Sequence, residues 1–77
     1  MDLNDFVSNF AEQFDETDLS EIRADTVYKE LNEWSSMVAL SVIAMIDAEY
    51  NVQLKGTDIY GSNTVEDLFN RVKNIRD

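Results

Sequence analysis

The side chains best suited to chemistry in this chain are two adjacent hydroxyls, those of Ser35 and Ser36, which stand between an acidic and an apolar stretch. A serine at the start of a helix has a fixed direction and lies beside backbone N–H groups that lack helical partners, an arrangement that favours a phosphate group. Serine is also a preferred helix cap, and on local physics alone capping is the stronger interpretation of the pair.

The rest of the composition removes most other kinds of catalytic or metal site. The chain contains no His and no Cys, so a Ser-His nucleophile, a disulfide and a cysteine zinc site are excluded. It lacks a glycine-rich phosphate loop, and its acids have no apolar surroundings that would tune one of them as a general acid. We therefore expect no catalytic residue, no metal site and no enzyme activity of the chain's own.

The charge of the chain restricts its partners. Sixteen acidic and six basic residues give a net charge of −10, which repels phosphate backbones and anionic membranes and favours partners with basic surfaces. Residues 1–34 hold ten acids and two bases, whereas residues 35–54 hold two acids and no base, so the acidic field is strongest before the serines. No apolar run approaches the ~18 residues of a membrane span, and the N-terminus does not resemble a signal peptide. These features predict a cytoplasmic monomer that binds neither nucleic acid nor membrane.

The elements that must position the serines are helices. Seventy-seven residues without Pro fit one small domain, residues 1–77, built from uninterrupted helices. Apolar residues at i, i+3, i+4, i+7, i+8 and i+11 indicate a first helix, with Asp2 or Asn4 as its cap. These apolar residues are Leu3, Phe6, Val7, Phe10, Ala11 and Phe14.

A long connection, residues 15–34, separates this helix from the serines. We expect one helical turn in it, at residues 26–31, with Asp25 as the cap. A stretch of this length with little regular structure is uncommon in a compact domain and usually has a function.

The central helix, Ser36–Tyr50, is the most clearly indicated element. Its residues show no period-2 alternation, Ser35 is a competent cap, and Asn51 suits a left-handed stop. Core packing explains its apolar face. That face is marked by Met37, Leu40, Ile43, Ile46 or Asp47, and Tyr50, and is widened by Val42 and Met45.

Two further helices complete the predicted architecture. A short one covers residues 57–60 and is closed by Gly61. The last one has Asn63 or Thr64 as its cap, and Thr64 and Asp67 have the spacing of a capping box. The last helix has an apolar stripe of Val65, Leu68, Phe69, Val72 and Ile75. The expected fold is all-α, a four-helix bundle with three main helices, a short third helix and a long first loop.

A longer pattern around the serines resembles the acyl carrier protein family. Its parts are Glu33-Trp34-Ser35-Ser36-Met37, then Ala39-Leu40, and then Ile46-Asp47-x-Glu49-Tyr50-Asn51-Val52-x-Leu54. In that family Asp-Ser-Leu or Asp-Ser-Met opens the second helix, which ends in a pattern close to Glu-Glu-Phe-Gly-Val-x-Ile. Farther on, Thr64-Val65-x-Asp67-Leu68 resembles the opening of the fourth helix of the family.

The resemblance implies an acyl-carrier-type bundle whose 4′-phosphopantetheine arm is transferred from coenzyme A to Ser36 by a holo-carrier-protein synthase. The arm would carry acyl thioester intermediates of fatty-acid or specialised, polyketide-like biosynthesis to processing enzymes with basic docking patches. Ser35 stands where the family has Asp and is the less favoured attachment residue. The second helix is also poorer in acids than in fatty-acid carriers, which favours a dedicated pathway.

The resemblance also implies partner-binding residues on the second helix. Met37 and Val38 would give an apolar contact beside the arm, and Asp47 and Glu49 would act as docking acids, although a solvated helix face explains the two acids equally well. Trp34 is better explained as cover for the helix start than as a partner contact. The alternative for the whole chain is a carrier-like interaction module that is not phosphopantetheinylated, and the absence of Asp before Ser36 favours it.

Overall fold

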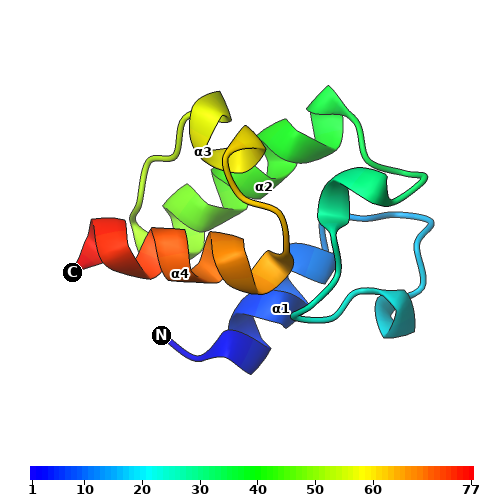
Figure 1. Cartoon of the computed structure of the whole chain (residues 1–77), viewed down its shortest axis with the longest axis horizontal. Helices are drawn as coiled ribbons and strands as arrows, with labels where there is room; N and C mark the ends of the chain where they lie inside the picture. Colours follow the sequence, from blue (N-terminus) through cyan, green and yellow to red (C-terminus); the bar gives the residue numbers. More distant parts are fainter.

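The computed structural model describes all residues, 1–77, and shows an all-helical chain without strands. Its α-helices are α1 (Leu3–Ala11), α2 (Ser36–Tyr50), α3 (Gly56–Tyr60) and α4 (Val65–Arg76), and two 3₁₀ turns, η1 (Leu19–Glu21) and η2 (Tyr28–Glu30), lie between α1 and α2. In Figure 1, α1 lies against both α4 and α2, and α3 lies against α4. The predicted fold, three main helices with a short third helix and a long first loop, is confirmed.

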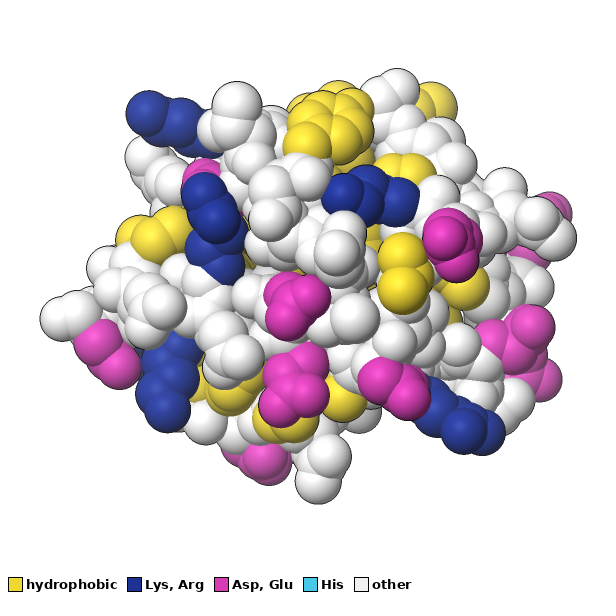
Figure 2. Space-filling model, in the orientation of Figure 1, with side chains coloured by type: hydrophobic (Ala, Val, Ile, Leu, Met, Phe, Trp, Pro, Cys, Tyr) yellow, Lys and Arg dark blue, Asp and Glu magenta, His cyan; other side chains and the backbone are white.

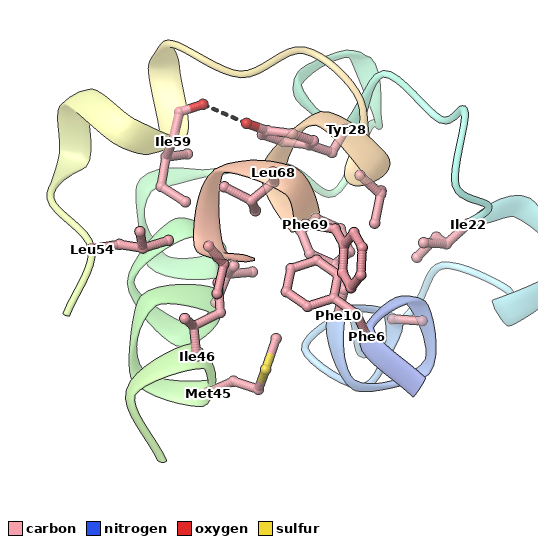
Figure 3. Close-up of a cluster of buried hydrophobic side chains, with 14 of the residues drawn as sticks. Phe6, Phe10, Ile22, Tyr28, Met45, Ile46, Leu54, Ile59, Leu68 and Phe69 are labelled. Atoms are coloured by element: carbon pink, nitrogen blue, oxygen red, sulfur yellow. Dashed lines mark hydrogen bonds between the residues drawn. The ribbon is translucent and has the colours of Figure 1, made fainter. Parts of the chain in front are cut away.

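A single cluster of apolar side chains holds the helices together (Figure 3). Every α-helix contributes to it, and so does the long loop, through Ile22 and Tyr28. Full burial of each large side chain stabilises the fold by about 1.5–3 kcal/mol before entropy is counted. The largest fully buried side chains are Tyr28, Phe6, Phe10, Ile46, Ile59 and Leu68.

The first helix is shorter than the apolar stripe predicts. The N–H groups of Gln13 and Phe14 bond to the carbonyl oxygens of Phe10 and Ala11 at 3.1 Å, a tighter i to i−3 pattern that ends the helix at Ala11. Phe14 is nevertheless buried, with its ring centroid 5.5 Å from that of Phe10. Of the two predicted caps, Asp2 is the one formed, and it accepts a hydrogen bond from the Asn4 N–H at 3.2 Å.

The long connection contains more structure than predicted. The expected turn forms as η2, but Asp25 does not cap it, because the capping position is Val27, which makes no side-chain bond. The turn η1 was not predicted and is capped by Asp18, whose carboxylate accepts from the Ser20 N–H at 2.9 Å. That backbone hydrogen bond is the main reason why the pKa of Asp18 is lowered from its usual value.

The predicted apolar face of α2 is confirmed only in part. Val42, Met45 and Ile46 are in the core, whereas Met37 is 79% exposed and Leu40 is 64% exposed. Because α2 carries apolar residues all round, its periodicity does not select the face that packs against the other helices.

The stripe of α4 is confirmed except for Ile75, which is half exposed because it lies in the last turn, at the end of α4 that projects outward in Figure 1. None of the helices has both the length and the apolar character needed to cross a membrane.

Candidate functional site

The start of α2 brings the two serines to the surface in different roles. Ser35 has extended backbone angles and is the N-cap, with its Oγ accepting from the Val38 N–H at 3.2 Å. Its carbonyl oxygen accepts the first helical hydrogen bond, from the Ala39 N–H, at 2.9 Å. Ser36 is the first helical residue, and its exposed hydroxyl takes part in no hydrogen bond of the protein. The hydroxyl of Ser35 is therefore engaged in capping, and that of Ser36 is free.

Two backbone donors remain unused beside the Ser36 hydroxyl. The N–H groups of Ser36 and Met37 form no hydrogen bond within the protein, and the first turn of α2 contains no acid. Unpaired N–H groups and the positive end of the helix dipole both favour an anion at this position. The start of α2 thus fits a phosphate ester on Ser36, and no carboxylate of its first turn opposes it.

Trp34 covers the inner side of this helix start. It is half-buried, and its ring centroid lies 5.0 Å from that of Tyr28 and 6.3 Å from that of Phe14. Since both neighbours belong to the core, the structure supports the interpretation of Trp34 as cover.

Glu33 ties the acidic loop to the residues just before the serines. Its carboxylate accepts hydrogen bonds from the N–H groups of Asp15 (2.7 Å), Glu16 (3.0 Å) and Thr17 (2.8 Å) and from the Thr17 hydroxyl (2.7 Å). We call this arrangement the Glu33 clasp. The hydroxyl bond from Thr17 and the backbone bonds lower the pKa of Glu33. Sequence reasoning missed the clasp, because residues 16 to 18 positions away in the chain make it.

The outward face of α2 next to Ser36 is apolar. Met37 and Leu40 are exposed on it, and Tyr60 of α3 is exposed as well, at 65%. Figure 2 shows hydrophobic side chains at the surface in the upper part of the view, where α3 and the first half of α2 lie in Figure 1. A flat apolar surface beside a free hydroxyl suits contact with another protein.

The predicted partner-binding residues fall into two groups. Met37 follows Ser36 directly on the exposed face, and Val38 is half-buried and packs against the core. Asp47 and Glu49 are exposed near the other end of α2, about 16–20 Å farther along the axis. The structure therefore places the apolar pair at the serines and the acids at a distance from them.

Tyr28 and its neighbours hold α3 in place. The buried Tyr28 hydroxyl donates to the carbonyl oxygen of Ile59, as drawn in Figure 3, and the carbonyl oxygen of Ser62 lies 2.9 Å away. Burial raises the pKa of Tyr28 to about 12. On the outside, Lys29 donates to the carbonyl oxygen of Tyr60 at 2.9 Å. No local sequence pattern predicts this role of Tyr28, because the two carbonyl oxygens belong to residues 31 and 34 positions away.

An ion pair closes the other side of α3. The Arg71 Nε lies 2.7 Å from a carboxylate oxygen of Asp58, and the other oxygen of Asp58 accepts from the Lys55 N–H at 2.9 Å. The backbone hydrogen bond and the guanidinium lower the pKa of Asp58. None of the three surface hollows of the molecule is lined by a residue of α2, so the candidate site is an open surface.

A comparison with protein families agrees with this geometry. The model described as "phosphopantetheine attachment site" matches residues 4–72, a range that runs from the first turn of α1 into α4 and includes both serines. The comparisons with curated proteins and with solved structures gave no match. The group that this family carries is covalently attached 4′-phosphopantetheine, and the start of α2 fits its phosphate. With the family match over most of the chain and the matching helical fold, the chain belongs to the phosphopantetheine attachment family of carrier proteins.

Proposed function

We propose that the chain is an acyl carrier protein and that Ser36 is its attachment residue. The observation that carries this proposal is the start of α2, where an exposed hydroxyl lies beside two unpaired N–H groups in a turn without acids. When bound, phosphopantetheine supplies a terminal thiol on which an acyl group is held as a thioester. Ser35 is the less favoured attachment residue because its Oγ already caps the helix.

The residues around Ser36 have supporting roles in this proposal. Ser35 fixes the first turn of α2, and Trp34 and the Glu33 clasp hold the chain that leads into it. The chain itself offers no His or Cys to act as a base, so the transferase must remove the proton from the Ser36 hydroxyl. The protein thus acts as a single carrier domain, residues 1–77, without catalysis of its own.

Partner enzymes would meet the carrier at α2. Met37 and Val38 provide the apolar contact beside the arm, and Asp47 and Glu49 provide acids for basic patches on the holo-carrier-protein synthase and on acyl-processing enzymes. The net charge of −10 speeds such encounters at low salt. Tethering the acyl group raises its effective concentration at each partner.

The outward face of α2 favours a dedicated pathway over general fatty-acid synthesis. Ser41, Ala44 and Ala48 are exposed on it and carry no charge, so a partner that recognises many acids on this helix would find few. We therefore assign the carrier to a specialised, polyketide-like pathway, with fatty-acid biosynthesis as the second candidate.

The alternative is an interaction module that is never modified, and Ser35 in place of the family's Asp favours it. Intact mass measured after incubation with coenzyme A and a broad-specificity phosphopantetheinyl transferase separates the two. The carrier gains one phosphopantetheinyl group, Ser36→Ala abolishes the gain, and Ser35→Ala retains it. Unmodified wild-type protein would reject the carrier function, and a gain lost only in Ser35→Ala would reassign the attachment residue.

A further inference from the structure

An apolar hollow lies on the outer side of α1, away from the start of α2. Its volume is about 280 Å³, and it is formed between α1 and the turn η1. Most of its lining is apolar, although it opens to the surface. The lining residues are Val7, Ser8, Ala11, Glu12, Leu19 and Ile22.

Leu19 forms one wall of the hollow and is 62% exposed although its backbone is held on both sides. Downstream, the buried Ile22 donates its N–H to the carbonyl oxygen of Leu19 at 3.2 Å, and directly upstream Asp18 caps the turn. Upstream, the Glu33 clasp holds Thr17. The Leu19 side chain is held in a solvent-exposed position next to an apolar hollow. A partner that covered it would gain the favourable free energy of burying its apolar surface.

Acidic side chains flank the hollow. Glu12 is part of its lining, and Asp15, Asp18 and Glu21 are exposed in the chain that forms its far wall. Arg23, directly after this wall, is the only basic residue before Lys29. Apolar surface with an acidic border complements a partner that is apolar and basic.

We propose that this hollow is a docking site for a basic amphipathic segment of a partner protein. An aliphatic side chain of that segment enters between Val7 and Leu19, and its Lys or Arg residues face Glu12 and the acids of the loop. None of the residues involved belongs to α2, so a partner held here leaves Ser36 accessible. The proposal goes beyond the proposed function, because docking at this site does not require a modified Ser36.

The test uses the unmodified full-length protein, so its outcome is independent of phosphopantetheine. The probe is a 14-residue helical peptide of Leu and Lys with its leucines on one face, titrated into ¹⁵N-labelled protein at about 0.15 M salt, where only nearby charges act strongly. We expect the largest amide shifts in Val7–Glu12 and Leu19–Ile22.

Two matched variants locate the apolar contact. Leu19→Ser and Leu40→Ser each remove a leucine of nearly equal exposure, 62% and 64%, so neither should unfold the protein, which circular dichroism checks. Leu19→Ser should raise the Kd of the peptide about fivefold, and Leu40→Ser should raise it less than about twofold. A peptide of the same composition with its leucines spread around the helix should bind more weakly to the wild type and equally to both variants.

Several results would overturn the proposal. These are no binding at millimolar peptide, larger shifts in α2 than in α1, or a greater loss of affinity for Leu40→Ser than for Leu19→Ser. A second copy of the chain is a further possible occupant, because the exposed Ile75 lies between Lys73 and Arg76. Sedimentation that shows a dimer dissociated by Leu19→Ser would assign the hollow to self-association and reject a separate partner.

Discussion

The helices α2 and α4 begin in opposite ways. At the start of α4 the first three N–H groups are all paired: Val65 donates to the carbonyl oxygen of Thr26 at 3.1 Å, Glu66 to that of Ala24 at 2.8 Å, and Asp67 to the Thr64 Oγ1 at 3.0 Å. The carboxylate of Asp67 in turn accepts from the Thr64 N–H at 3.1 Å. At the start of α2 only the third N–H, that of Val38, has a capping partner.

We call the start of α4, with its N–H groups paired, the sealed start, and the start of α2, with two N–H groups unpaired, the open start. Two acids in the first turn of α4, Glu66 and Asp67, satisfy its dipole and repel other anions, whereas the first turn of α2 has none. At the start of α2 the protein lacks the stability that hydrogen bonds to all three N–H groups would contribute. The unpaired N–H groups remain available to a phosphate. The sealed start fixes residues 24–26 of the loop, and the open start leaves two N–H groups free for the phosphate of the arm in the function proposed above.

Among the changes near the sealed start, removal of the Tyr28 hydroxyl should lower the stability of the protein most. Tyr28→Phe leaves the buried carbonyl oxygen of Ile59 without its donor and removes the hydroxyl that lies 2.9 Å from the carbonyl oxygen of Ser62, at a cost of about 1–3 kcal/mol in the free energy of unfolding. Urea denaturation measures this loss. Tyr60→Phe is the control, because the Tyr60 side chain is exposed and its hydroxyl has no partner, and it should change stability little. An equal loss in both variants would contradict the role of the Tyr28 hydroxyl.

The Tyr28 hydroxyl should also make the stability of the protein fall at alkaline pH. Tyr28 has a pKa of about 12 in the folded protein against 10.0 as a free group, so its contribution is complete below pH 10 and is lost as the pH rises from 10 to 12. The wild type should lose stability over this range, and Tyr28→Phe should lose less of it.

An acid placed in the open start should make it resemble the sealed one. Met37→Glu puts a carboxylate at the helix position that Glu66 occupies in α4, and it removes the apolar contact beside Ser36. We expect kcat/KM for phosphopantetheinyl transfer to fall roughly tenfold, about 1.4 kcal/mol, while stability stays equal or rises by about 0.3–1 kcal/mol. The reciprocal change, Glu66→Met, should leave transfer unchanged. Transfer that is unaffected by Met37→Glu would show that the open start does not assist modification.

The two caps should also differ in their contribution to stability. Thr64→Ala removes the Oγ1 that accepts from the Asp67 N–H at 3.0 Å and leaves only the backbone half of a capping box, so it should cost about 1–2 kcal/mol. Ser35→Ala loses a bond of 3.2 Å that belongs to no capping box and should cost about 0.5–1 kcal/mol. Thermal denaturation of the two variants measures the difference. A larger loss of stability in Ser35→Ala than in Thr64→Ala would contradict this comparison of the two caps.

The smallest expected effect is a local response to acid. The backbone bond from Thr64 lowers the pKa of Asp67 below the free value of 3.8, so the capping box is intact above that pH and is lost as the pH falls through the folded pKa. The Thr64 amide should therefore shift in NMR spectra between about pH 5 and pH 2. The Val38 amide is bound to a serine hydroxyl and should not follow the same curve, and a shared midpoint would contradict the assignment.

Features that depend on neighbours within four residues agreed with the sequence. The bounds of α2, its cap Ser35, the left-handed stop at Asn51 (φ 57°) and the capping box of α4 all form as expected. Ser36 was selected by family resemblance, because a serine at a helix start is usually only a cap. Two local predictions failed: the first helix ends at Ala11, before the apolar stripe does, and Asp25 does not cap η2, because it lies in a separate turn that leads the chain to α4.

Tertiary contacts decided the rest. The sequence placed Val42, Ile46, Met37 and Leu40 together on the apolar side of α2, and only packing in the shared core buried the first two and left Met37 and Leu40 exposed. The Glu33 clasp and the pairing of Thr26 with Val65 join groups 16 to 39 residues apart, and no local pattern encodes such partners. Local hydrogen bonding set where each helix begins and ends, whereas the burial of apolar surface between distant segments determined which side of α2 remains open to a partner.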